Sequence, residues 1–92
     1  MSDKLKNLRD QIDGLDEQIQ TLISERAKIA QQVATAKQTS SDEAYYRAER
    51  EAEVLRKVMA RNKGPLSDEE IARLFREIMS ACLALEQVMT LA

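Results

Sequence analysis

The sequence contains no histidine and only one cysteine, Cys82. Without histidine, the chain cannot form histidine-dependent catalytic triads, histidine–metal sites or the usual proton shuttle near neutral pH. A single cysteine excludes an internal disulfide and any metal cluster made of cysteines. We therefore expect a functional site that uses neither a metal ion nor a cofactor.

Aromatic residues, glycine and proline are also scarce. Aromatics make up 3% of the chain, and there are two glycines and one proline. So few aromatics leave little for a β-sandwich core or for a base-stacking surface. The remaining composition is 33% charged and dominated by good helix formers. With 92 residues, we expect one all-α domain that spans residues 1–92.

The chain also lacks an excess of positive charge and any long apolar segment. The net charge is −2, so no global basic field predicts a nucleic-acid partner. No apolar run approaches the roughly 20 residues of a membrane span. The segment Met1–Leu5 has no apolar core of the signal-peptide kind. We expect a cytoplasmic protein whose partners include neither nucleic acid nor membrane.

Apolar periodicity predicts three helices. They cover about Asp3 to Gln38, about Ala44 to Asn62, and about Ser67 to Thr90. The residues expected on their buried faces are Leu5, Leu8, Ile12, Leu15, Ile19, Leu22, Ile29, Val33 and Ala36 in the first (the apolar stripe), Ala48, Ala52, Leu55 and Met59 in the second, and Ile71, Leu74, Ile78, Cys82, Leu85 and Met89 in the third.

The break between the second and third helices has its own signals. Gly64 suits a left-handed cap, and Pro65 cannot continue a helix. Ser67 and Glu70 are spaced as a capping box at the start of the third helix.

The length of the first helix predicts a dimer. A helix of about 36 residues is about 54 Å long. A compact chain of 92 residues has a radius of gyration of roughly 12 Å. The helix would therefore protrude with its apolar stripe exposed, and the same helix of a second copy is the simplest cover, because two-fold dimers are the commonest oligomers.

Cations on the first helix predict an anion site. Arg26 interrupts the apolar stripe, where an unpaired charge is costly. Lys37 follows three turns later on nearly the same face, about 16 Å away. The residues between them on that face, Ala30 and Val33, are small, and Arg9 lies at the edge of the stripe. Two cations separated by small residues on a packed face predict a pocket for an anion.

Each of these residues also has a structural reading. Lys and Arg often cover an apolar face with their stems and keep the charge in water. Arg47 and Glu51 are spaced as a helix-surface pair. Cys82 fits a small core residue, and Glu86, one turn later, fits a solvated carboxylate.

Taken together, three stretches resemble the three helices of the all-helical chorismate mutases. They are Leu8–Lys37 with Arg9, Arg26 and Lys37, Tyr46-Arg47-x-x-Arg50-Glu51, and Leu74–Glu86 with Cys82. They occur in the family's order and spacing over almost the whole chain. The chain most resembles the mutase domain that begins bacterial bifunctional chorismate mutase–prephenate dehydratases. It looks like that domain on its own.

The resemblance implies an intertwined homodimer that rearranges chorismate to prephenate for phenylalanine and tyrosine biosynthesis. Each of its two sites would use residues of both chains. Arg26 and Arg9 of the other subunit would hold the substrate carboxylates. Lys37 would bridge a carboxylate and the breaking ether oxygen. The resemblance also places in the site Arg50, Glu51 as acceptor for the ring hydroxyl, Cys82, and Glu86 facing the ether oxygen.

Three positions depart from the pattern of some relatives. Position 86 is Glu rather than Gln, and position 82 is Cys rather than Ser, so hydroxyl donation is lost there. Position 47 is Arg rather than Asp, and we transfer no hydroxyl-binding role to it.

Two other functions fit the same pattern. One is an isochorismate pyruvate-lyase on the same fold, whose site is also cationic. The other is a helical dimerisation module without enzymatic activity, which predicts no binding of small anions and tolerance of Arg26→Ala. The mutase reading fits the composition, because a unimolecular rearrangement needs no nucleophile, metal or proton shuttle.

Overall fold

The computed structural model describes residues 2–36 and 43–91, with side chains for 2–36 and 47–86. Its three helices are α1 (Ser2–Ala36), α2 (Glu43–Arg61) and α3 (Asp68–Leu91). These described stretches contain no β-strand, which confirms the all-α prediction. The predicted helix ends agree within about one residue, except that Gln38 lies outside the described residues.

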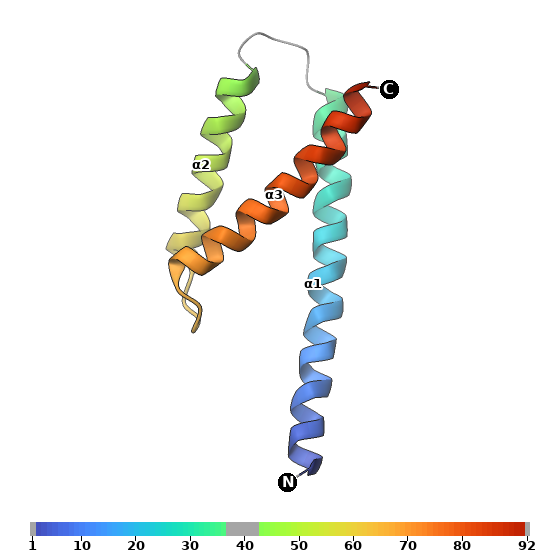
Figure 1. The fold of residues 1–92 in the computed structure, drawn as a ribbon, viewed down its shortest axis with the longest axis vertical. Helices are drawn as coiled ribbons and strands as arrows, with labels where there is room; N and C mark the ends of the chain where they lie inside the picture. Colours follow the sequence, from blue (N-terminus) through green and yellow to red (C-terminus); the bar gives the residue numbers. More distant parts are fainter. Residues whose placement is uncertain (1, 37–42, 92) are drawn as a thin grey trace.

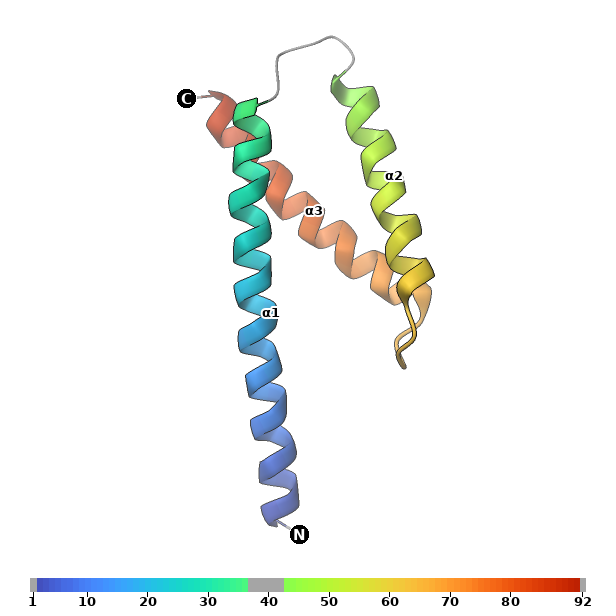
Figure 2. The same ribbon diagram turned by 180° about the vertical axis from the view of Figure 1, so that it is seen from behind.

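Helix α3 crosses diagonally between the other two helices (Figures 1 and 2). It contacts both α1 and α2, whereas α1 and α2 do not contact each other within the described residues. The second half of α1 lies against the second half of α3, and the end of α2 lies against the beginning of α3. The first half of α1 therefore extends alone, beyond the reach of α2 and α3.

The single chain encloses only a small core. Among the described side chains, the buried apolar ones are Val58, Ala72 and Cys82. The radius of gyration is 16.9 Å, against roughly 12 Å for a compact chain of this length. The accessible surface is 7769 Å², about 2400 Å² more than expected for a folded monomer of this mass. This excess is large enough for an extensive protein–protein interface.

The turn between α2 and α3 is closed by Asn62. Its Nδ2 donates to the carbonyl of Leu66 and to Oδ1 of Asp68, each at 2.8 Å, and its Oδ1 accepts from the N–H of Gly64 at 3.4 Å. Gly64 does not have a positive φ. The predicted left-handed cap is therefore wrong, because the Asn62 side chain satisfies this turn instead.

One of the two hydrogen bonds of the predicted capping box is present, the one that the Ser67 side chain accepts. Ser67 Oγ accepts from the N–H of Glu70 at 3.1 Å, which satisfies one of the unpaired amides at the start of α3. The carboxylate of Glu70 accepts from Arg73 at 2.5 Å, a pair three residues apart on the helix surface.

The apolar stripe is exposed throughout in the single chain, and the predicted buried faces of α2 and α3 need correction at four positions. Ala48 and Ala52 of α2 are exposed, as are Leu74 and Leu85 of α3, at 46% and 37%. The diagonal crossing explains the difference, because each helix meets its neighbour over a short stretch and on a rotated face. Val58 of α2 and Ala72 of α3, both absent from the predicted faces, are buried instead.

Candidate active site

Helix α1 has two different faces in its second half. The side facing α3 carries half-buried residues that recur every three or four positions, which are Arg26, Ala27, Ala30, Gln31 and Ala34. The apolar stripe lies beside this face and is exposed, with Leu22 at 62% and Ile29 at 59%. Arg26 lies about 40° round the helix from Leu22 on one side and from Ala30 on the other. It therefore marks the boundary between the face that α3 covers and the uncovered stripe.

The guanidinium of Arg26 contacts α3 through Cys82. Nη1 of Arg26 donates to Sγ of Cys82 at 3.3 Å, and Cys82 is 4% exposed. A thiol is a weak acceptor, and a guanidinium has five N–H donors. Among the described residues, Cys82 thus contacts one edge of Arg26, and a guanidinium has further N–H groups that can bind an anion.

Glu86 follows Cys82 by one turn on α3 and is half-buried. Residues four apart lie on the same side of a helix. Glu86 therefore belongs to the face of α3 that meets α1, one turn further along from the Arg26–Cys82 contact.

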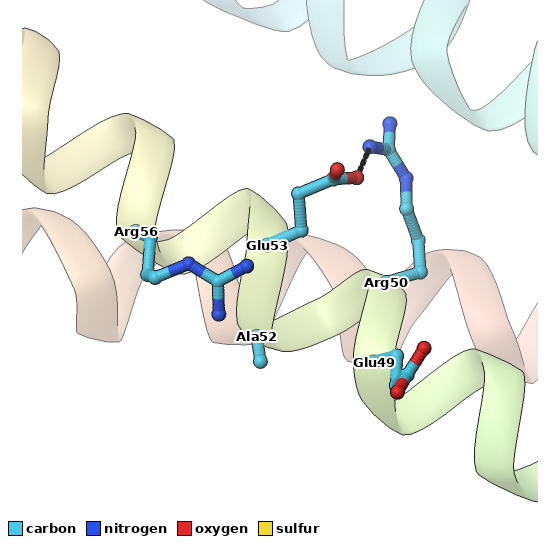
Figure 3. Close-up of a pocket in the computed structure, with 5 residues that line it drawn as sticks. All are labelled: Glu49, Arg50, Ala52, Glu53 and Arg56. Carbon is cyan, nitrogen blue, oxygen red and sulfur yellow. Dashed lines mark hydrogen bonds and ion pairs between the residues drawn. The ribbon is translucent and has the colours of Figure 1, made fainter.

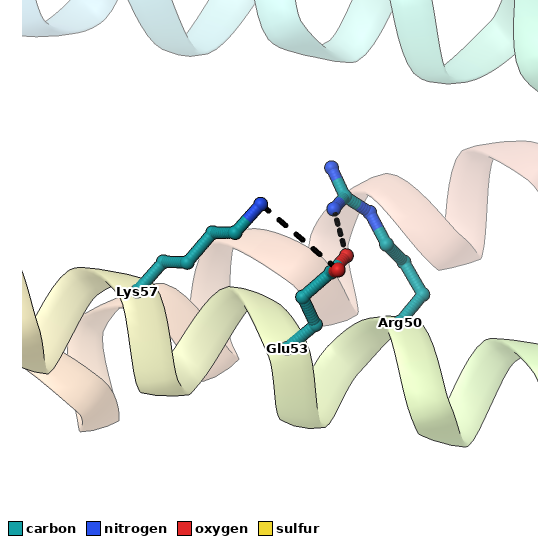
Figure 4. Close-up of polar contacts among 3 residues, drawn as sticks. All are labelled: Arg50, Glu53 and Lys57. Carbon is teal, nitrogen blue, oxygen red and sulfur yellow. Dashed lines mark hydrogen bonds and ion pairs between the residues drawn. The ribbon is translucent and has the colours of Figure 1, made fainter.

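The two predicted site residues of α2 differ in exposure. Glu51 is half-buried, as is its neighbour Arg47. The side chain of Arg50 is 66% exposed and donates from Nη1 to Oε1 of Glu53 at 2.5 Å. Nζ of Lys57 lies 4.0 Å from the other oxygen of Glu53. Figure 4 shows the three side chains on one side of α2.

Glu53 was missed by the sequence analysis. Its pairing could have been predicted from the sequence, because Arg50, Glu53 and Lys57 follow the three- and four-residue spacing of helix-surface pairs. The hydrogen bond from Arg50 and, next, the positive charge of Lys57 lower the pKa of the Glu53 carboxyl below its usual value. Glu53 is therefore ionised at neutral pH.

An open depression of about 450 Å³ lies on the surface of α2. Its lining residues are Glu49, Arg50, Ala52, Glu53 and Arg56 (Figure 3). It includes Arg50 but neither Arg26 nor Cys82. The depression on one chain therefore does not unite the predicted site residues.

Arg9 lies far from the other predicted site residues of its own chain. It is exposed on the protruding half of α1, and the 17 positions between Arg9 and Arg26 correspond to about 26 Å of helix. One small molecule cannot reach both within a single chain. Lys37, the remaining predicted site residue, lies outside the described residues.

Two features are absent from the described part of the chain. Within it, no group of three or more Cys, Asp or Glu side chains is arranged to hold a metal ion. None of its helices is both long enough and apolar enough to span a membrane.

The comparisons with known proteins agree on one family. The model of the type II chorismate mutase family matches residues 8–87. The chain is 60% identical to a bifunctional chorismate mutase/prephenate dehydratase of Stutzerimonas stutzeri over 99% of its length, and 57% identical to one of Pseudomonas aeruginosa over 98%. It spans 26% of the length of each of these relatives.

A solved structure gives the same result. The chorismate mutase of Thermus thermophilus superposes with a TM-score of 0.77 at 31% sequence identity, over 91% of this chain and 94% of that one. Sequence and fold thus agree over almost all of the chain, and the chain belongs to the type II chorismate mutase family.

Proposed function

We propose that this chain is a chorismate mutase, an isomerase that rearranges chorismate to prephenate by a unimolecular [3,3] shift. The observation that carries the proposal is Arg26, a half-buried cation held by Cys82 at the edge of an uncovered apolar face, in a chain of this family. The substrate is a dianion, and Arg binds planar carboxylates with paired hydrogen bonds.

The active form is a homodimer in which the apolar stripe packs against the partner chain. Eight residues of the stripe are large and 45–62% exposed in the single chain, which are Leu5, Leu8, Ile12, Leu15, Ile19, Leu22, Ile29 and Val33. Monomeric proteins rarely expose so continuous an apolar surface. The distance between Arg9 and Arg26 supports sites made from both chains, with Arg9 entering the partner's site.

The catalytic work is positioning and electrostatics. Arg26 and the partner subunit's Arg9 hold the two carboxylates, which keeps the substrate in its folded, reactive shape. Lys37 places a positive charge between a carboxylate and the ether oxygen, where electron density grows as the C–O bond breaks. Glu51 accepts from the ring hydroxyl, and Arg50, Cys82 and Glu86 complete the lining. No proton, nucleophile or metal takes part in the bond changes.

An assay on the purified chain tests the function directly. Chorismate should disappear and prephenate form with saturation kinetics, and isochorismate should yield no pyruvate. Sedimentation at micromolar concentration should give twice the chain mass. Pyruvate release from isochorismate without turnover of chorismate would assign a lyase instead. A folded chain inactive on both substrates would leave a dimerisation module.

Cys82 variants test the contact with Arg26. We expect Cys82→Ser to keep kcat/KM within about threefold, because a hydroxyl also accepts from Arg26. Cys82→Ala removes the acceptor and should lower kcat/KM about tenfold, the effect of losing one hydrogen bond of about 1.4 kcal/mol. Urea unfolding of both variants separates this loss from the cost of the cavity. Equal kcat/KM in Cys82→Ala and wild type would show that the contact has no part in turnover.

A further inference from the structure

Glu53 is a charged residue that the proposed function leaves without a role. It lies on α2 between two cations, with Arg50 bonded to one carboxylate oxygen at 2.5 Å and Lys57 at 4.0 Å from the other. Its own side chain is 43% exposed, less than that of either partner, at 66% and 61%. The carboxylate is thus the central member of a three-residue network.

The network faces the space between α2 and α1. Figures 3 and 4 show the side chains of Arg50 and Glu53 on the side of α2 toward α1, and Figure 4 shows Lys57 there as well. Figure 3 shows Ala52 of the same helix pointing away from that side. Arg26 belongs to α1, and the proposed site residues Cys82 and Glu86 belong to α3, which crosses between α1 and α2. The network is therefore oriented toward the candidate site.

One contact to Glu53 restrains Arg50 without exhausting its donors. An unrestrained Arg side chain loses much rotamer freedom when it binds a ligand. Among the described residues, Glu53 accepts from Nη1 of Arg50 and from no other Arg50 nitrogen, and a guanidinium has further N–H groups that can bind a carboxylate. Lys57 offsets the negative charge of Glu53, so the three side chains together present one net positive charge to an anion.

We propose that Glu53 is a positioning residue, which holds the Arg50 guanidinium on the α1 side of α2 for the anionic substrate. This inference rests on the proposed function. It predicts that substrate binding depends more on the acceptor oxygen of Glu53 than on its negative charge. A competing role, in which Glu53 occupies Arg50 and is displaced by substrate, predicts the opposite sign. A plain helix-surface pair predicts no effect on substrate binding.

Steady-state kinetics of the dimer with chorismate separate these roles. Glu53→Ala should raise KM about tenfold, equivalent to about 1.4 kcal/mol, with kcat changed less than about threefold, because the lost contact serves binding. Glu53→Gln keeps an acceptor oxygen and should restore KM to within about threefold of wild type. Glu70→Ala is the matched control, since Glu70 accepts from Arg73 in a surface pair of the same spacing and distance on α3, outside the proposed site. It should leave both constants unchanged.

A double variant tests whether Glu53 acts through Arg50. Arg50→Ala and Arg50→Ala/Glu53→Ala should have the same KM, because Glu53 then has no guanidinium to hold. Sedimentation and helicity of every variant exclude loss of the dimer. A lowered or unchanged KM in Glu53→Ala, or a further rise in the double variant, overturns the positioning role alone. Absence of turnover in the wild type overturns the proposed function and this inference together.

Discussion

Arg9→Ala and Arg26→Ala should each be nearly inactive, and activity should return when the two are unfolded together and refolded. The physical reason is the length of α1, which places the two arginines about 26 Å apart in one chain. Loss of one charged contact to the transition state lowers turnover by on the order of 100-fold or more. Both variants should remain helical, because neither substitution removes one of the buried residues Val58, Ala72 and Cys82.

The amount of recovered activity is itself a prediction. In a two-fold dimer with shared sites, each mixed dimer contains one site with both arginines and one site with neither. Random pairing makes about half of the dimers mixed, so the refolded mixture should reach about a quarter of wild-type specific activity. Refolding each variant alone is the control. If differently tagged variants form mixed dimers that remain inactive, Arg9 and Arg26 do not serve a shared site.

Glu86→Ala should lower kcat/KM strongly, on the order of 100-fold, whereas Glu86→Gln should preserve or raise it at neutral pH. An amide donates a hydrogen bond to the ether oxygen at every pH, and a carboxyl group donates only when protonated. Glu86→Gln should therefore keep its activity across the pH range, while Glu86→Ala should be poor throughout. Turnover of all three proteins from about pH 5 to about pH 9 tests this.

Helicity at each pH controls for unfolding in these measurements. Glu86→Gln as damaged as Glu86→Ala would contradict a donor role for Glu86. The half-buried position of Glu86, one turn from the residue that contacts Arg26, then calls for a structural explanation.

The helices were predictable because their signals are local. Apolar spacing of three and four residues gave the three segments, and the Ser67 cap gave the start of α3 to within one residue. The Asn62 turn was missed because Gly64 is the stronger sequence signal for a helix end. An Asn side chain that reaches the far side of a turn is visible only when both sides are in place.

The candidate site was predictable in part. Arg26 was predicted because a charge within an apolar stripe is unusual, and the family resemblance added residues of the other two helices. The roles of these residues in the site stay predictions. Glu53 was missed because pairs of this spacing are common on helix surfaces, and only the side of α2 on which the network lies distinguishes it. Lys37 stays a prediction, since it lies outside the described residues.

The sequence by itself determined the three helices and the overlong first helix with its apolar stripe, and it predicts a chemistry limited to charge and positioning. The tertiary structure decided which side of each helix is covered, and that Arg26 meets Cys82, 56 positions away. The physical reason is that successive residues of a helix are rotated by about 100°, so the sequence alone shows which residues share a side of the helix. The crossing of two helices depends instead on side chains from distant segments packing together. The diagonal path of α3 left Leu74 and the apolar stripe exposed, and this uncovered surface is where we expect the second chain.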